Sequence, residues 1–360
     1  METTMRVKNR TNKQSGFSLI EMLVAMGITL VLVMATLSVF DSATRANEAG
    51  TQLANMNQNL RVGMNLMARD LLQTGQGIPT GGIPIPNGVG TTLINRPNPP
   101  NWAALTFPAT YITLPSVAPG AGLGPQNANT LGVATDMVNI LYSDATLPLV
   151  STAAPPNSQF VSISANGSQI TVNAANPING AGVNNPIVAG DLIMVTSPTG
   201  SRVQCVTGVA GQVITFNAGD VFNLNQRGAP NGSILDLRVG GVFPVNTFTA
   251  LRIDMFTYYL NTTARARIPR LMRQYNFQVA RSVAEVIENL QLAYDFVDGV
   301  TNPTDQKTVP AGLSESQIRK VNLFLAGRSD QVYSANQQYF RNSLETQISL
   351  RSLSFFNQYQ

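Results

Sequence analysis

The chain has 360 residues, enough for one large domain or two ordinary ones, and its charged fraction of 12%, with 29 glycines and 21 prolines, favours a β-rich body with many turns. Residues 1–16 hold +3 of the net charge of +4, so the remainder is nearly neutral and a nucleic-acid-binding surface is not expected. The chain contains no histidine, which excludes Ser-His-Asp and Cys-His catalysis and His-ligated metal sites, and we expect neither enzymatic activity nor a cofactor.

A long N-terminal helix is the first predicted element. Residues 17–40 contain a single charged side chain, Glu21, and as a helix they would be about 36 Å long, sufficient to cross a hydrocarbon core of ~30 Å. We therefore expect 17–40 to be the transmembrane half of the helix, and the basic residues ahead of it favour a cytoplasmic N-terminus. Residues 41–75 are predicted to be its amphipathic half, because apolar residues recur there at steps of three and four. These residues are Leu53, Met56, Leu60, Met64, Met67 and Leu71.

The start of this helix carries a specific motif. The stretch SGFSLIEMLVAMGITL, which begins at Ser15, resembles the class III signal of type IV prepilins and of type II secretion pseudopilins. The resemblance implies that residues 1–16 are a prepilin leader, that a prepilin peptidase cleaves between Gly16 and Phe17, and that the new N-terminus is methylated. Glu21 would then be the fifth residue of the mature chain. The alternative is an ordinary signal anchor that contains a stray glutamate.

The position of Glu21 requires a physical explanation, because a carboxylate inside a membrane needs a partner or a proton. An unpaired charge there is costly, so intramembrane carboxylates are treated as functional by default. The resemblance implies that Glu21 attracts the freed amine of Phe17 in a neighbouring subunit as subunits stack into a filament. Attraction between opposite charges is strong and short-ranged in a low-dielectric environment, so this contact would set the axial register between helices.

Residues 76–130 form a second region, rich in proline and glycine. Between 78 and 129 there are ten prolines and seven glycines, and Arg96 is the only charged side chain. Such a stretch does not hold long regular elements, so we expect an extended arm that wraps a sheet or projects from it. Trp102 and Phe107 are expected to pin this arm to the rest of the molecule. The alternative function for these aromatic residues is a platform for sugar binding.

Residues 131–360 are predicted to form a β-rich globular head. Short β-branched or alternating runs are separated by NG, AG and SPTG turns, a pattern typical of antiparallel strands. The longest run is TFTALRIDMFTYYLN, residues 247–261. One segment differs, because the spacing of apolar residues in SVAEVIENLQLAY, residues 282–294, predicts a short helix. The other expected strands lie in TDMVNILYS, FVSISANGSQITVN, GDLIMVTS, SRVQCVTGVAGQVITFN, SILDLRV, IRKVNLFLAGRS and SLETQISLRSLSF.

Later segments extend the resemblance along the chain. LRVGMNLMARDLLQTGQG, GDLIMVTSPTGSRVQCVTGV and VAEVIENLQLAYDFVDG occur in the order that PilW-type minor pilins show. The chain departs from that pattern by lacking a cysteine just after the helix and by having Ser352 where an asparagine is usual. The resemblance implies an α+β, type IV pilin-like fold, in which the long N-terminal helix packs on a head of antiparallel sheets.

Two features of the head are candidates for chemistry. Cys205 is the only cysteine and forms no intrachain disulfide, and its alternating surroundings predict a small core residue. The segment DFVDGVTNPTDQ places Asp295, Asp298 and Asp305 in an expected loop, and calcium prefers such oxygen ligands. The spacing is not that of an EF-hand, so these are weak calcium candidates beside the simpler interpretation of a solvated acidic turn.

The resemblance implies a function in assembly. The chain would be a minor pilin that helps to initiate type IV pilus assembly and stays near the pilus tip. Its partners would be other minor and major pilins, prepilin peptidase and the inner-membrane assembly platform. It would cross the inner membrane once before assembly and reach the cell surface with the pilus. Two alternatives stay open: a GspJ-like pseudopilin of a type II secretion system, and a filament-displayed adhesin or ligand-binding module.

Overall fold

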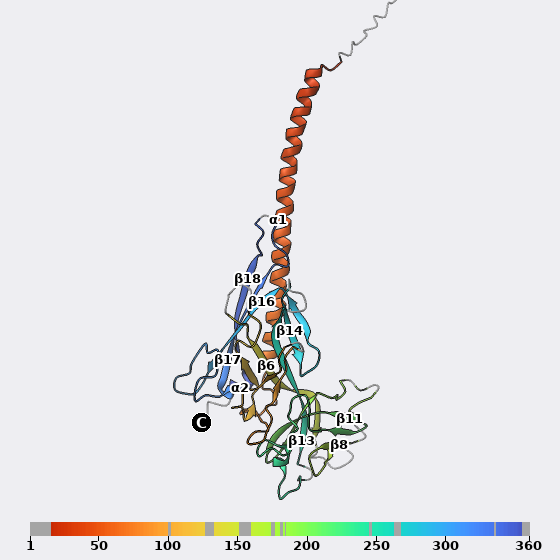
Figure 1. Cartoon of the computed structure of the whole chain (residues 1–360), viewed down its shortest axis with the longest axis vertical. Coiled ribbons are helices and arrows are strands. Elements are labelled where there is room, and N and C mark those ends of the chain that lie inside the picture. Colours follow the sequence, from red (N-terminus) through yellow and green to blue (C-terminus); the bar gives the residue numbers. More distant parts are fainter. Residues whose placement is uncertain are drawn as a thin grey trace, which may run out of the picture.

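The chain consists of a long helix, α1 (Leu19–Gln73), followed by a body built from antiparallel strands. Figure 1 shows α1 projecting far beyond the strands that surround its second half. The computed structural model describes residues 16–99, 102–126, 133–150, 160–173, 177–180, 183, 185–244, 247–262, 268–334 and 336–354. Of residues 145–150, 160, 161 and 354 only the backbone is described.

Helix α1 has a cap at each end. Ser18 Oγ accepts a hydrogen bond from the Glu21 backbone N–H at 3.2 Å, and the Glu21 carboxylate accepts one from the Ser18 N–H at 3.0 Å. This reciprocal capping box satisfies two N–H groups that lack a partner within the helix. The helix ends at Gln73, and Gly75 follows with a φ of +79°, a conformation that glycine adopts without steric cost. The predicted continuous helix of both halves is confirmed.

The two halves of α1 differ in exposure. Every large apolar side chain between residues 17 and 40 is exposed, whereas one face of the second half is buried. The face predicted from the residue spacing is confirmed from Met56 onward, while Leu53 remains 36% exposed. The buried residues of this face are Met56, Leu60, Met64, Met67 and Leu71.

A seven-stranded antiparallel sheet forms the centre of the head. Its strands are β5 (Val117–Gly120), β6 (Met137–Val150), β9 (Leu192–Ser197), β10 (Gly200–Cys205), β13 (Thr249–Asn261), β14 (Arg270–Tyr275) and β15 (Arg281–Glu285). Their order is β10-β9-β13-β14-β15, with β6 paired to β13 and β5 paired to β6. Strand β13 therefore pairs with three others, β6, β9 and β14, as expected for the longest alternating run of the sequence.

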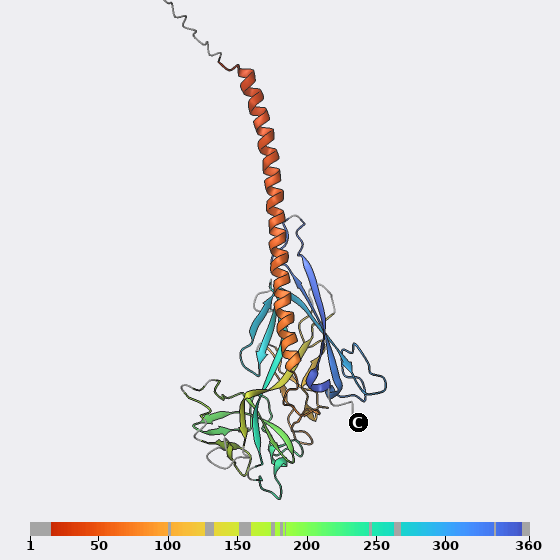
Figure 2. The same cartoon turned by 180° about the vertical axis from the view of Figure 1, so that it is seen from behind.

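Smaller antiparallel sheets complete the head. One contains β16 (Ile287–Phe296), β17 (Ile318–Arg328) and β18 (Arg341–Ser349). Another contains β7 (Phe160–Ile163), β8 (Gln169–Val172), β11 (Gly208–Ala210) and β12 (Val213–Thr215). Helix α1 contacts β15 of the central sheet and both β17 and β18, so its second half lies between two sheets, as Figure 2 shows from behind. The short helices are η1 (Ile234–Leu237), η2 (Glu315–Gln317) and α2 (Arg351–Ser354).

The buried apolar side chains form three clusters, and β13 contributes to all of them. Phe256 and Leu260 belong to the cluster around α1, Met255 to the one beneath the arm, and Ala250 to the one around β8 and β12. Because side chains alternate along a strand, a single central strand can face two layers. The head is thus held together along β13.

The proline-rich arm is packed onto the head along much of its described part, although Val89 and Ile112 are exposed. It forms the short strands β1 (Ile83–Pro84), β2 (Asn95–Arg96), β3 (Leu105–Thr106) and β4 (Thr113–Leu114). Arg96 is 2% exposed, and its guanidinium donates hydrogen bonds to the Asn139 side chain and to the carbonyls of Ala118 and Pro119. Phe107 is buried, and the Trp102 ring lies 5.9 Å from that of Tyr259. The expectation that these two aromatic residues pin the arm is confirmed.

Two expectations about secondary structure are wrong. Residues 282–294 form parts of β15 and β16 instead of a helix, with a break at Val286, whose φ is +61°. The register of β16 against β17 shifts between Ile287 and Asn289, so the break displaces the strand alternation and mimics helical spacing. In SILDLRV, the expected strand is the 3₁₀ helix η1, capped by the Ser233 side chain. The last expected strand, in SLETQISLRSLSF, ends early, because β18 stops at Ser349 and Arg351–Ser354 form the helix α2. The other expected strands are confirmed where the structure describes them.

Candidate membrane anchor and assembly site

The junction between Gly16 and Phe17 lies just ahead of α1, outside regular secondary structure. Gly16, Phe17 and Ser18 are all exposed, and Phe17 has 89% of its surface accessible. The capping box brings the Glu21 carboxylate back to the Ser18 N–H, one residue beyond Phe17. The structure therefore places the three residues of the predicted cleavage and assembly site at one accessible helix end, with the carboxylate hydrogen-bonded to the Phe17–Ser18 peptide group, one peptide bond beyond the predicted cut.

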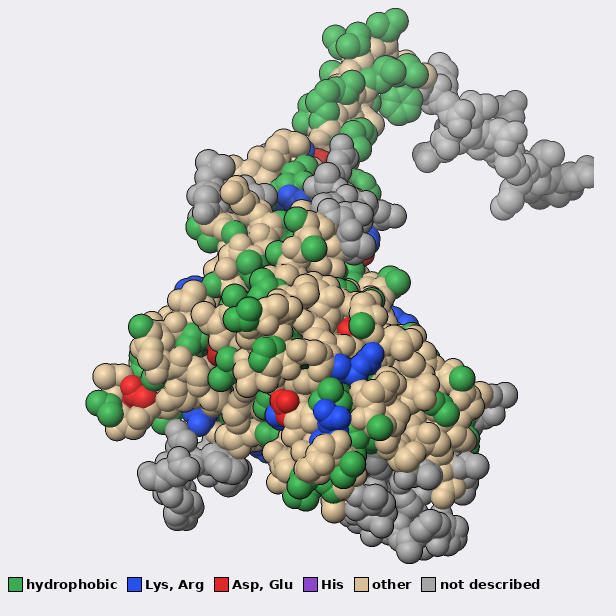
Figure 3. All heavy atoms as spheres, turned by 60° about the horizontal axis from the view of Figure 1, so that its bottom comes forward, with side chains coloured by type: hydrophobic (Ala, Val, Ile, Leu, Met, Phe, Trp, Pro, Cys, Tyr) green, Lys and Arg blue, Asp and Glu red, His purple; other side chains and the backbone are tan. Residues whose placement is uncertain are grey.

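The first half of α1 presents apolar side chains in every direction. Among the described residues, α1 is the single helix that is long and apolar enough to cross a membrane, and its most apolar segment is not buried by the rest of the molecule. Figure 3 shows hydrophobic side chains covering the part of the helix that projects from the head. A helix that is apolar all round needs lipid or other protein as its environment. This half can therefore be placed in a membrane or in a bundle of similar helices.

A buried ion pair fastens the other half of α1 to the head. Asp70 is fully buried, and its Oδ2 accepts hydrogen bonds from Arg273 Nε and from the Tyr258 hydroxyl, both at 2.7 Å. The Arg273 guanidinium also lies over the Phe256 ring, 3.5 Å from its centroid. This contact was not predicted from the sequence. The available signal was a carboxylate on the apolar face of an amphipathic helix, because such a group needs a cationic partner.

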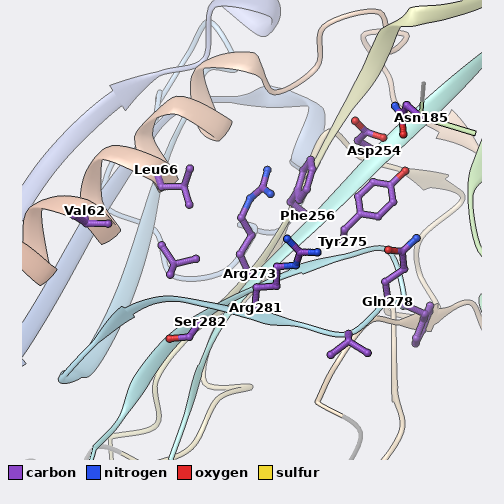
Figure 4. Close-up of a pocket in the computed structure, with 13 residues that line it drawn as sticks. Val62, Leu66, Asn185, Asp254, Phe256, Arg273, Tyr275, Gln278, Arg281 and Ser282 are labelled. Atoms are coloured by element: carbon purple, nitrogen blue, oxygen red, sulfur yellow. The ribbon is translucent and has the colours of Figure 1, made fainter. Parts of the chain in front are cut away.

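A groove of about 1100 Å³ opens beside this ion pair, between α1 and the strands β13 to β15. Val62 and Leu66 of α1 face Arg273 across it, and Asp254 and Tyr275 lie towards its other end (Figure 4). Burial raises the pKa of Asp254 to about 6, although a hydrogen bond with Tyr275 opposes this shift. The groove is therefore a mixed apolar and charged recess, accessible from the exposed side of the helix.

The calcium candidates are engaged in contacts with other residues, and Asp295 lies in strand β16 instead of in the expected loop. Asp298 accepts hydrogen bonds from the Thr301 hydroxyl and from the backbone N–H groups of residues 300 to 302, and these bonds hold its pKa well below its usual range. Asp295 and Asp305 both accept a hydrogen bond from the Asn322 side chain, whereas Asp298 is hydrogen-bonded to other residues. Within the described residues, no group of three or more Asp, Glu, Cys or His side chains is arranged to hold a metal ion.

Cys205 is a buried free thiol, as its strand pattern predicted. It is 1% exposed, and its backbone N–H donates a hydrogen bond to the Asn225 side chain. Burial raises the pKa of the thiol, so the reactive thiolate is disfavoured. The residue packs in the core beneath the arm.

Comparison with known proteins identifies the N-terminal motif. A family model described as the prokaryotic N-terminal methylation motif matches residues 11–37. Searches of the curated proteins and of the solved structures found no match. The motif, joined to a long helix that packs on antiparallel sheets, defines a type IV pilin-like protein with an α+β fold. More closely, the motif supports a pilin-like or pseudopilin-like subunit, and it implies processing by prepilin peptidase and association with a membrane through α1.

Proposed function

We propose that this chain is a PilW-like minor pilin, a non-enzymatic subunit that helps to initiate type IV pilus assembly and stays near the pilus tip. Before assembly it spans the inner membrane once, with its N-terminus in the cytoplasm. Prepilin peptidase then cleaves after Gly16, and the new N-terminus on Phe17 is methylated. The observation that carries the proposal is the exposed apolar half of α1, interrupted by one carboxylate beside the Gly-Phe junction.

Assembly in this proposal rests on two non-covalent contributions. The apolar helix halves of neighbouring minor and major pilins bury one another when the assembly platform removes them from the lipid. The Glu21 carboxylate of the membrane-bound subunit meets the freed amine of a neighbour, and the low dielectric constant makes this contact selective for one axial register. The buried ion pair of Asp70 keeps the head fixed to the helix, so that the register of the helix also sets the position of the head.

The charge of Glu21 can be tested separately from its capping role. Glutamine at position 21 retains the side-chain acceptor of the capping box and removes the charge, whereas alanine removes both. We expect Glu21→Gln and Glu21→Ala to be cleaved normally and to be recovered in sheared filaments at least about tenfold less than the wild-type chain, the loss expected for about 1.4 kcal/mol of contact energy. Asp41→Asn, which removes a charge from the exposed helix beyond the apolar run, is the matched control. Normal recovery of Glu21→Gln would refute the charge-pair mechanism.

A GspJ-like pseudopilin of a type II secretion system is the second candidate. The Gly-Phe junction, the apolar helix and Glu21 favour it equally, because the matched motif occurs in both kinds of subunit. Deletion of the gene distinguishes the two. Loss of surface pili and of retraction-dependent motility supports the minor pilin, whereas loss of secreted enzymes with pili intact supports the pseudopilin.

A further inference from the structure

A hollow on the head lies away from the helix, between the arm, the end of β13 and the turn that joins β14 to β15. Its volume is about 510 Å³. Three of its lining residues are aromatic, namely Trp102, Tyr259 and Phe277. Four others carry amides, namely Asn98, Asn261, Gln274 and Gln278. Among the described residues that line it, none is charged.

The aromatic rings of this hollow are held in place by the fold. The Trp102 ring is tilted by 53° against the buried ring of Tyr259, and the Phe277 ring packs edge-on against Phe222 at 4.6 Å. The Trp102 backbone N–H also donates a hydrogen bond to the Pro99 carbonyl of the same arm at 3.0 Å. The partly exposed rings of Trp102 and Phe277 therefore offer an apolar surface without the entropic cost of ordering it on binding, whereas the buried Tyr259 ring supports that of Trp102.

One amide in the hollow is incompletely satisfied. Gln274 is 3% exposed, and its Nε2 donates to the Gln278 carbonyl at 3.1 Å. Its Oε1 is buried and accepts no hydrogen bond from any described residue. A buried acceptor without a donor costs stability, so rotation of this amide towards a donor group of a ligand in the hollow recovers that energy. The side chain thus points to a ligand rich in hydroxyl or N–H groups.

We propose that this hollow binds a neutral saccharide. A sugar ring has an apolar C–H face that packs on aromatic rings and hydroxyl groups that donate to and accept from amides, and the hollow offers both partners. The uncharged lining gives no compensation to an anionic ligand, which would lose its hydration on entering. An uncharged proline-rich peptide fits less well, because proline has no N–H to donate to Gln274 Oε1. This site is independent of the assembly function of α1.

The single tryptophan makes the site directly observable, because Trp102 is the only tryptophan of the chain. The full chain is solubilised in a detergent without a sugar headgroup and titrated with cellotetraose, chitotetraose, N-acetyllactosamine and, as the anionic comparison, sialyllactose. We expect a saturable change in tryptophan emission with at least one neutral saccharide at millimolar concentration. A response to none of the neutral saccharides, or a response only to sialyllactose or to a proline-rich peptide, would overturn the proposal.

Substitutions inside and outside the hollow show where the saccharide binds, when the affinity of each variant is measured by calorimetry. Trp102→Ala removes the ring and should weaken binding at least about tenfold, and Gln278→Ala, an exposed change that leaves the core intact, about threefold. Tyr111→Ala removes an aromatic ring from the same arm outside the hollow, so the affinity should be unchanged. Circular dichroism confirms that each variant is folded. Wild-type affinity in both folded Trp102→Ala and folded Gln278→Ala would place the saccharide elsewhere and contradict the assignment.

Discussion

The side chain of Asp70 attaches the helix α1 to the head through a buried ion pair and a hydrogen bond. The carboxylate is withdrawn from water, and its energy depends on Arg273 and Tyr258, which come from two neighbouring strands. Breaking a buried pair leaves an uncompensated charge, which costs far more than losing an exposed pair. The arginine is 23% exposed, so water can partly solvate it when the carboxylate is lost.

The first prediction concerns this pair. We expect Asp70→Asn to lower the free energy of unfolding by about 2 to 4 kcal/mol, because the substituted amide keeps an acceptor for Tyr258 but leaves the Arg273 charge unpaired. Asp41→Asn removes the exposed pair with Arg45, which is 2.9 Å long, and should cost less than about 0.5 kcal/mol. Denaturant titration followed by Trp102 fluorescence measures both. Equal costs for the two variants would show that the Asp70 contact does not fasten the helix.

The second prediction concerns pH and Asp254. Its pKa rises from 3.8 to about 6 on folding, chiefly through burial. As the pH increases through this window the unfolded chain releases the proton first, so the folded state loses stability. Asp254→Asn should therefore be more stable than the wild type by about 1 to 3 kcal/mol above pH ~7, with the difference disappearing below pH ~4. Thermal unfolding at several pH values measures this. A difference that does not change with pH would exclude titration of Asp254 as its origin.

At the scale of elements, α1 fits the head because Gly63 has no side chain. A Cβ at this position would lie 3.0 Å from Leu271 and 3.4 Å from Ala284, which is tighter than ordinary packing. Around Gly50, on the same helix, a Cβ would meet nothing within 4 Å. Gly63 thus allows close packing of helix and sheet, whereas Gly50 only weakens the helix.

This contrast gives the third prediction. We expect Gly63→Leu to lower the free energy of unfolding by about 1 to 3 kcal/mol, because the added side chain overpacks the interface with the sheets. Gly50→Leu, the matched control, should leave the stability unchanged or raise it by up to about 1 kcal/mol, because leucine favours the helix. Chemical denaturation compares them. If Gly63→Leu were as stable as Gly50→Leu, the close approach of helix and sheet would be disproved.

Elements with a strong internal pattern were predictable from the sequence. The repeat of Met56, Leu60, Met64 and Met67 identified the buried face of α1 because helical spacing persists over several turns. The segment 282–294 was misjudged because its apolar spacing is helical only across the break at Val286. Within β16 the true alternation is visible in Leu290, Leu292, Tyr294 and Phe296, all of which are buried. A bulge shifts the alternation of side chains between the two faces of a strand, and its position cannot be recognised in a single sequence.

At the scale of the whole molecule, the candidate site divides into a predictable and an unpredictable part. Gly16, Phe17 and Glu21 follow one another within six residues, so the local motif is enough to single them out. The Asp70–Arg273 pair joins residues 203 positions apart, and the hollow around Trp102 and Gln274 assembles the arm with two strands. Only tertiary folding brings such groups together. Sequence patterns therefore identify the membrane end of the molecule and single out Trp102 as a candidate for sugar binding, but they do not reveal the residues that surround it in the head.

The division of α1 into an exposed apolar half and a half that is packed in the head is the central feature of this molecule. In the filament that we propose, the helices of neighbouring subunits would cover the exposed half, and the packed half would carry the head outside that bundle. Mass spectrometry of sheared surface filaments tests this account most directly. The account predicts a mature chain that begins at Phe17 and carries one additional methyl group on its amine. Recovery of the chain only from membranes, with Met1 to Gly16 still attached, would contradict it.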